Sequence, residues 1–203
     1  MLGDLFNAWP GDDDSGDPFN ASVIDAFRLL SDRGIPVFFQ HGNRDFLLGS
    51  RFAQSTGGTL LAEEVVVDIE GTPTLLMHGD QLCTDDVGYQ QFRAQVRNPQ
   101  WQQMVLEQPL AMRKALAKEM REGSDSSKAG KSMKIMDVNA DAVSQAFHRH
   151  GVSRMIHGHT HRPARHVVTV DGRERERIVL PDWRDSGAYV LVDGERIETH
   201  PLD

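Results

Sequence analysis

The stretch RMIHGHTHRP, residues 154–163, joins a short apolar run to a polar loop that carries His159 and His161. The apolar run predicts a strand, and Gly158 marks the point where the strand gives way to the loop. Side chains two positions apart on an extended segment point to the same side. The two imidazoles are therefore expected to face a common ligand, and one could serve each of two metal ions.

Two other apolar segments lead into loops of the same kind. IPVFF (35–39) precedes the loop GNRD (42–45), and TPTLLM (72–77) precedes HGD (78–80). In open α/β sheets, ligands bind at the carboxyl ends of strands. The three loops are therefore expected to converge on one crevice of an α/β fold, and Asp4, which follows Gly3, would make a fourth.

The rest of the chain alternates predicted helices and strands. Helices are predicted at 20–33, 47–54 and 140–151, a strand at 60–71, and hairpins at Asp171-Gly172 and Asp193-Gly194. Residues 85–122 show a helical pattern and form an insertion at about 85–135, whose segment 123–132 predicts a flexible basic loop by composition. No repeat or interdomain linker is visible, so residues 1–203 are expected to form a single domain.

Composition excludes several classes of protein. The chain has 203 residues, of which 39% are hydrophobic, enough for one sizeable core. A net charge of -8 argues against general nucleic-acid binding, because a phosphate backbone attracts clustered Lys and Arg. Cys83 is the only cysteine, which rules out an intrachain disulfide and favours a reducing compartment. No apolar run approaches the roughly 18 residues of a spanning helix, so a protein neither integral in a membrane nor exported is expected.

The types of candidate ligand indicate a divalent transition metal ion. Imidazole nitrogen mixed with carboxylate and amide oxygen differs from the thiolate set of structural zinc. A carboxylate such as Asp4 can bridge two ions roughly 3.5 to 4 Å apart, as in two-metal phosphoester cleavage. Taken singly, His78 could be a hydrogen-bonded surface residue, Asn43 a turn residue, and the acidic cluster Asp12–Asp14 a solvated loop. The joint occurrence of the motifs, each after a strand, favours the metal site.

The order of the motifs resembles that of the calcineurin-like metallophosphoesterases. Gly-Asp at 3–4 is followed by GNRD, HGD and GHTH. The longer strings GDLFNAWPGDDD, HGNRDFLLG, LLMHGDQLCTDD, KSMKIMDVN and IHGHTHRP are similar to the branch of that family that acts on UDP-2,3-diacylglucosamine. The likeness covers essentially the whole chain. It implies a four-layer α/β/β/α sandwich, with the helical insertion at about 85–135 as a cap.

The resemblance also implies a site with two manganese ions. The implied metal ligands are Asp4, Asn43, His78, His159 and His161. Arg44 and His159 are the implied catalytic residues, and Arg44 would neutralise charge that develops on the phosphate oxygens. The implied substrate contacts are Asn43, Arg44, Asp86, Ser124, Lys128, Lys131 and His159.

The implied activity is hydrolysis of the diphosphate bond of UDP-2,3-diacylglucosamine in lipid A biosynthesis. Attack of a metal-activated water on the α-phosphate would release UMP and 2,3-diacylglucosamine 1-phosphate, lipid X. Apolar side chains of the insertion could line a groove for acyl chains or simply pack on the domain. Its basic residues could rest on anionic headgroups or form a solvated helix face: Arg93, Arg97, Arg113, Lys114, Lys118 and Arg121. The implied protein is a cytoplasmic monomer attached peripherally to the inner membrane.

One element of the family pattern has no counterpart in this sequence. The family begins with a strand that ends in Asp-x-His, upstream of the Gly-Asp motif. The first strand of the family fold is therefore expected to be absent from this chain. The ion bound by His161 would then have only two protein ligands, Asp4 and His161. Two alternatives to the hydrolase stay open: an inactive or non-catalytic remnant of the same fold, and a phosphodiesterase that acts on a soluble nucleotide. The retained ligands and Arg44 disfavour a scaffold.

Overall fold

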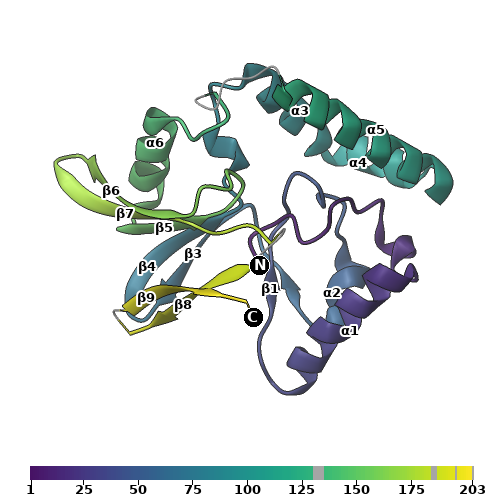
Figure 1. Cartoon of the computed structure of the whole chain (residues 1–203), viewed down its shortest axis with the longest axis horizontal. Helices are drawn as coiled ribbons and strands as arrows, with labels where there is room; N and C mark the ends of the chain where they lie inside the picture. The colour runs from purple at the N-terminus through teal and green to yellow at the C-terminus, as the bar shows by residue number, and fades with distance from the viewer. Residues whose placement is uncertain (130–134, 184–186, 195, 203) are drawn as a thin grey trace. The chain divides into compact units, whose positions relative to one another are not determined.

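The computed structural model describes residues 1–129, 135–183, 187–194 and 196–202. The chain divides into two compact units, and each is described by itself. The first unit comprises Met1–Ala62 and Asp86–Met133, and the second comprises Glu63–Asp85 and Lys134–Asp203. Helices and strands are mixed along the chain, which confirms the α/β class (Figure 1). The single domain with an inserted cap stays a prediction.

A five-stranded mixed sheet forms the centre of the second unit. Its strand order is β3-β4-β5-β7-β6. The strands are β3 (Glu64–Ile69), β4 (Thr72–Met77), β5 (Arg154–His157), β6 (Ala164–Val170) and β7 (Arg173–Val179). The three central strands β4, β5 and β7 run parallel, while β3 and β6 pair antiparallel at the edges. The carboxyl ends of β4, β5 and β7 therefore lie at one edge of the sheet.

Helix α6 (Ala140–His150) covers one face of this sheet (Figure 1). The side chain of Asn139 accepts hydrogen bonds from the first backbone amides, and Gly151 ends the helix in a left-handed conformation, as predicted. Val143, Ala146 and Phe147 are buried on its inner side. They pack in one core cluster with residues of the central strands, including Leu75, Met77 and Met155.

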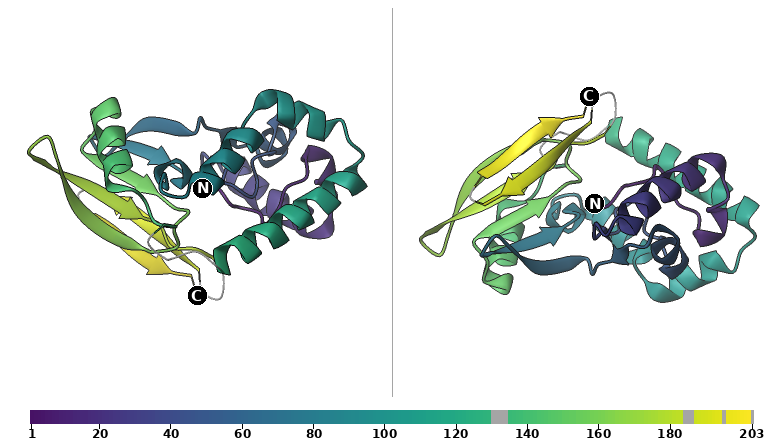
Figure 2. Two further views of the ribbon diagram at one scale, coloured as in Figure 1. Left: turned by 90° about the horizontal axis from the view of Figure 1, so that it is seen from above. Right: turned by 90° about the horizontal axis from the view of Figure 1, so that it is seen from below.

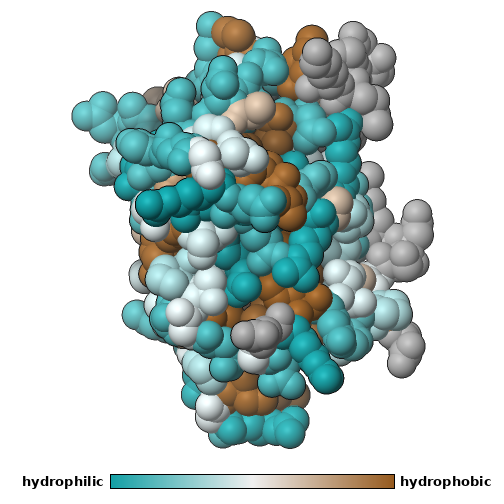
Figure 3. Space-filling model, turned by 90° about the vertical axis from the view of Figure 1, so that its left-hand side faces the viewer, coloured by the Kyte–Doolittle hydropathy of each residue, from teal (hydrophilic) through white to brown (hydrophobic). Residues whose placement is uncertain are grey.

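The remaining strands of the second unit form hairpins. β6 and β7 are joined at Asp171-Gly172, and β8 (Ala188–Asp193) pairs with β9 (Arg196–Pro201), so both predicted hairpins are confirmed. Both residues of the first turn have positive φ. Figure 3 faces the side on which the β6–β7 hairpin lies in Figure 1, and it shows hydrophilic residues with hydrophobic patches between them.

The first unit is built on a short parallel sheet and an aromatic core. β1 (Phe38–Phe39) pairs with β2 (Thr59–Leu60), and on its other side Leu2 forms a bridge with Gln40. Only two residues of the predicted strand 35–39 are therefore in a ladder. Helices α1 (Pro18–Asp32) and α2 (Ser50–Thr56) pack beside it. The core cluster includes Phe6, Trp9, Phe39 and Phe52.

The helical pattern predicted at 85–122 is confirmed, and the described part of the insertion contains three helices. They are α3 (Val87–Val96), α4 (Pro99–Leu106) and α5 (Leu110–Ala129), and Figure 2 shows them from two further directions. Asn98 caps α4 and Pro99 occupies its first turn, while Pro109 precedes α5. The flexible loop predicted at 123–132 is wrong for residues 123–129, because a helix already formed gains one hydrogen bond for each residue added. No helix of the described residues is long and apolar enough to cross a membrane.

The acidic cluster Asp12–Asp14 is not the solvated loop that the sequence predicts. It forms a 3-10 turn, η1, whose three carboxylates each contact another part of the first unit. Asp12 accepts hydrogen bonds from the backbone amides of Gly49 (2.9 Å) and Phe52 (3.1 Å) at the start of α2. Asp13 and Asp14 form ion pairs with basic residues of α5. The cluster is therefore a structural anchor.

Candidate metal centre

Asp4 and Arg44 lie together in the first unit. The backbone amide of Arg44 donates to Oδ1 of Asp4 at 2.9 Å, and its Nε lies 3.5 Å from Oδ2. Asp4 has a φ of 56°, a left-handed conformation that a residue other than glycine adopts only when its surroundings hold it there. Gly42 approaches so closely that a Cβ would clash with Asp4. The predicted metal ligand and the predicted catalytic arginine are thus positioned by one another.

Asp45 holds the two loops of this group together, a role that the sequence reasoning missed. Its side chain is fully buried. Its carboxylate accepts hydrogen bonds from the amides of Leu5 (2.7 Å), Gly42 (2.6 Å) and Asp4 (3.2 Å). The only signal in the sequence was its place in the GNRD motif. Asn43, the other predicted ligand of this unit, lies in the same loop.

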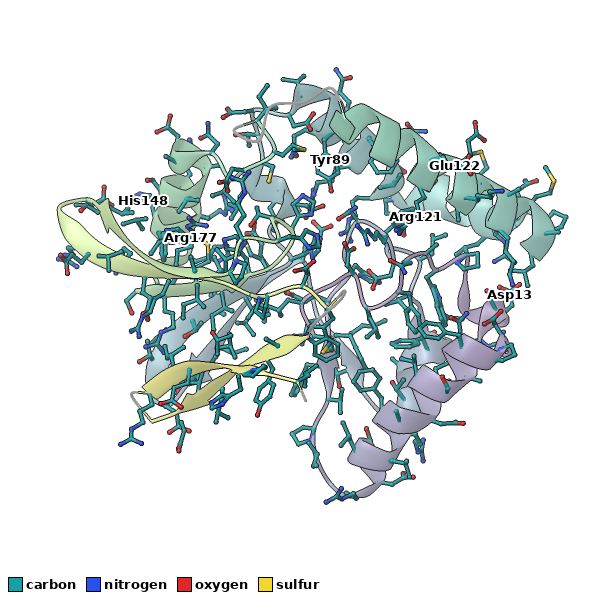
Figure 4. All side chains as sticks on the ribbon, in the orientation of Figure 1. Asp13, Tyr89, Arg121, Glu122, His148 and Arg177 are labelled. Atoms are coloured by element: carbon teal, nitrogen blue, oxygen red, sulfur yellow. The ribbon has the colours of Figure 1, made fainter. Side chains whose placement is uncertain are left out.

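Asn7 connects the side chain of Arg44 with a residue of the insertion. Oδ1 of Asn7 accepts from Nη1 of Arg44 and from Nη1 of Arg121, each at 3.1 Å. Figure 4 labels Arg121 on helix α5. Two guanidinium groups therefore meet at one amide oxygen, which favours binding of an anion such as a phosphate group near Arg44.

The other predicted substrate contacts lie on or after the helices of the insertion. Asp86 is buried and caps α3, where its Oδ1 accepts from the amide of Tyr89 at 3.0 Å. Its carboxylate thus has a structural partner whatever else it binds. The backbone of α5 includes Ser124 and Lys128, but their side chains lie outside what the structure describes, and Lys131 lies outside the described residues altogether.

His78 and His159 meet at the carboxyl ends of β4 and β5. The amide of Gly158 donates to the carbonyl oxygen of His78 at 2.9 Å, and Nδ1 of His159 lies 3.2 Å from Nε2 of His78. Two imidazoles bound at right angles, about 2.1 Å from one ion, would place their nitrogens about 3 Å apart. The observed spacing therefore fits a pair of ligands to one ion.

The argument that placed His159 and His161 on an extended segment is wrong. Their φ angles are 64° and 54°, so both residues are left-handed and the loop is not a continuation of β5. Such angles are uncommon outside glycine and are concentrated at functional sites. The prediction that both histidines bind metal does not depend on the extended geometry.

His161 has a carboxylate partner that the sequence reasoning also missed. Its Nδ1 lies 2.9 Å from Oδ2 of Asp182, which follows the carboxyl end of β7. Metal-binding histidines typically donate their second ring nitrogen to a carboxylate, which fixes the ring and its tautomer. This contact fits His161 as a ligand through Nε2. The signal in the sequence was an acid just after an apolar run, in IVLPD at 178–182.

The predicted metal ligands divide between the two units. Asp4 and Asn43 belong to the first unit, while His78, His159 and His161 belong to the second. In the part of the chain that the structure describes, no group of three or more His, Cys, Asp or Glu side chains is assembled. The donor chemistry and the two histidine contacts nevertheless fit a divalent ion.

Comparison with known proteins agrees with the motifs. The profile of the calcineurin-like phosphoesterases matches residues 1–163. A UDP-2,3-diacylglucosamine hydrolase from Cellvibrio japonicus (strain Ueda107) is 52% identical over 187 residues, which cover 92% of this chain and 78% of that protein. Proteins of the same name from Salmonella arizonae and Salmonella typhi are 48% and 49% identical over 198 residues, which cover 98% of this chain and 82% of each relative. The resemblance inferred from the sequence is confirmed, and this chain belongs to the calcineurin-like phosphoesterase family.

Proposed function

We propose that this chain is a metal-dependent hydrolase that cleaves the diphosphate bond of UDP-2,3-diacylglucosamine, yielding UMP and 2,3-diacylglucosamine 1-phosphate in lipid A biosynthesis. The names of relatives that are 48–52% identical over nearly the whole chain support the substrate. The structural observation on which the proposal mainly depends is the double contact of Arg44 with Asp4. It places a positively charged side chain that could bind phosphate next to a candidate metal ligand.

Five residues would hold the metal: Asp4, Asn43, His78, His159 and His161. Two manganese ions are proposed, since imidazole nitrogen and carboxylate or amide oxygen suit an ion of intermediate hardness. When bound, such ions polarise a phosphoryl oxygen and lower the pKa of a water. The protein's part is to orient these ligands: Asp45 clamps the Asp4 and Asn43 loops, and Asp182 orients His161.

Arg44 is proposed to neutralise the charge that builds up on the phosphate oxygens. Its backbone is fixed by Asp4 and its guanidinium by Asn7, so little reorganisation is needed when a phosphate arrives. His159 is the second proposed catalytic residue. Its Nδ1 faces His78, which leaves Nε2 as the nitrogen proposed to contact a phosphate oxygen.

Replacement of Arg44 tests the proposal. Arg44→Ala should lower kcat by about 10²- to 10³-fold, the loss typical of a donor to a developing oxyanion, with metal content unchanged. Arg44→Lys should recover only part of the rate, because lysine lacks the planar fork. Arg28→Ala, at an exposed arginine paired with Asp32 on α1, is the matched control. Unaltered turnover in Arg44→Ala would remove Arg44 from the mechanism.

The acyl chains separate the proposed substrate from a soluble nucleotide. Among the described residues of the insertion, four apolar side chains are more than 40% exposed: Val87, Met104, Leu106 and Met112. Exposed, adaptable apolar groups such as Met suit contact with flexible acyl chains. The diacylated UDP-sugar should therefore be cleaved with a much higher kcat/KM than its deacylated form. Equal values would favour the soluble-nucleotide enzyme, and metal binding without any turnover would favour a non-catalytic remnant.

We also propose that the chain is a cytoplasmic monomer attached peripherally to the inner membrane, and the same exposed residues support the attachment to a membrane surface. The basic residues support it less, because Arg97 donates to the carbonyl oxygens of His41 and Gly42, and Arg113 is buried. Co-sedimentation with vesicles tests the proposal. Met104→Ser with Met112→Ser should weaken binding to neutral vesicles, and retention unchanged by the double variant would contradict it.

A further inference from the structure

A small cavity lies in the second unit beside the Gly-His-Thr-His loop. Its volume is about 170 Å³. The polar residues that line it are Asp137, Thr160, Arg162, His166 and Arg177. Since one water occupies about 30 Å³, the cavity has room for on the order of five waters, well below the roughly 300 Å³ of a small pocket for a drug-sized ligand. Only a small group fits, and none of these residues is a predicted metal ligand or substrate contact.

Arg177 is a buried cation at the centre of this lining. It lies on β7 in register with Met155 of β5 and His166 of β6, so its side chain shares the sheet face that α6 covers. Figure 4 labels Arg177 there. It is only 9% exposed, and burial lowers the pKa of its guanidinium. A buried charge is costly unless an opposite charge or hydrogen bonds compensate it.

The one hydrogen-bond partner of Arg177 among the described residues provides no negative charge. Nη1 of Arg177 lies 3.0 Å from Nε2 of His157, and since arginine only donates, this nitrogen accepts. Nδ1 of His157 then carries the hydrogen and donates to the carbonyl oxygen of Gly158 at 3.0 Å.

Asp137 is the acidic residue of the lining, and it already has a cationic partner. Its Oδ2 forms an ion pair with Arg162, and its Oδ1 accepts from the amide of Val138 at 2.8 Å. One carboxylate therefore faces two guanidinium groups. The hydroxyl of Thr160 is buried in the same lining and has no hydrogen-bond partner among the described residues. The lining thus combines two arginines, one carboxylate and an unused hydroxyl donor.

We propose that this cavity binds a small oxyanion of the phosphate class, held by Arg177, Arg162 and the hydroxyl of Thr160. The guanidinium fork matches two oxygens of a tetrahedral anion, and a bound anion compensates the buried charge. The anion is either free inorganic phosphate or the phosphoryl group of a monoester whose remainder extends past the exposed residues Pro163 and Ala164.

Calorimetric titration of the full chain with inorganic phosphate tests the site. Runs with chelator and with added manganese separate it from phosphate bound at a metal centre, since the cavity should bind in both. Arg177→Gln should weaken binding at least tenfold, and Asp137→Asn, which removes the competing carboxylate, should strengthen it several-fold. Arg175→Gln is the matched control, because Arg175 lies two positions earlier on the same strand and outside the cavity.

A second variant guards against misfolding of Arg177→Gln. His166→Gln keeps the sheet position and removes a ring from the lining, so it should also change phosphate affinity. Parallel titrations with glucosamine 1-phosphate decide between the two sources: binding of both ligands identifies a phosphoryl group, and binding of inorganic phosphate alone identifies the free ion. A Kd of the native protein for inorganic phosphate above about 10 mM would overturn the proposal. The same Kd in Arg177→Gln and Asp137→Asn would overturn it as well.

Discussion

The guanidinium of Arg113 on helix α5 contacts both carboxylate oxygens of Asp13, 100 positions earlier in the chain. Nη1 lies 2.8 Å from Oδ1 of Asp13 and also donates to the carbonyl oxygen of Pro10 at 2.6 Å, while Nε donates to that of Gln108. Arg113 is 5% exposed, and a Cβ on Gly11 would clash with it. The contact fixes the insertion to the acidic cluster within the first unit.

Arg113→Met should lower the free energy of unfolding by about 2–4 kcal/mol, because it leaves the carbonyl oxygens of Pro10 and Gln108 without a donor and removes the buried cation that pairs with Asp13. Urea unfolding at neutral pH measures the change. Lys118→Met is the matched control on the same helix, since its pair with Glu122 is exposed, and it should change stability by less than about 0.5 kcal/mol. Equal effects of the two substitutions would show that Arg113 does not anchor the insertion.

The Asp13 carboxylate should make stability depend on pH. Its hydrogen bond with Arg113 holds the pKa of Asp13 below the ordinary 3.8. A group with a lowered folded pKa stabilises the protein above the unfolded pKa, and this stability is lost as pH falls through the folded value. Because the side chain is 46% exposed, the contribution should stay below about 1 kcal/mol. Asp13→Asn should lower stability at neutral pH and make it less sensitive to acid below pH 4; unchanged acid sensitivity would count against this role.

Asp12→Ala tests the second anchor of the acidic cluster. Gly49 precedes α2 without a capping side chain of its own, and Asp12 fulfils that role from 37 residues earlier. Its Oδ1 also accepts from Nε1 of Trp9 at 3.0 Å. Three donors would lose their acceptor, so a loss of about 1–3 kcal/mol is expected in thermal or urea unfolding. Asp25→Ala, at an exposed position of α1, is the control, and a loss as large there would contradict the capping role.

Asp182→Asn tests the partner of His161. If the carboxylate fixes the ring for metal binding, the substitution should weaken affinity for manganese by about 10- to 100-fold in competition with a chelator. Asp171→Asn offers a closely matched control. Its carboxylate also lies 2.9 Å from Nδ1 of a histidine, His148, but both side chains are well exposed and neither residue is a predicted ligand. Identical metal affinity in Asp182→Asn and the native protein would remove Asp182 from the metal centre.

The sequence predicted those elements that depend on residues adjacent in the chain, such as helix ends and hairpin turns. The helix at 140–151 with its end at Gly151 and the two Asp-Gly hairpins depend on neighbouring residues alone, and all are present. Breaks in the insertion were missed although Asn98-Pro99 and Pro109 mark them. For residues 123–129 a loop was predicted from composition, but α5 extends into them. Composition reports only the preference of these residues in isolation, and extending an existing helix adds a hydrogen bond for each residue.

The family and the types of candidate ligand were determined by the sequence, since motifs in a characteristic order survive as strings of letters. Which side chains support those ligands was decided only by the tertiary structure. Asp45, Asp182 and the acidic cluster make contacts across 3 to 100 positions, and a carboxylate has no sequence signature for the donor it will meet. The burial of a charged residue was also decided by the tertiary structure: of the three arginines in RERER, Arg177 is buried whereas Arg173 is exposed.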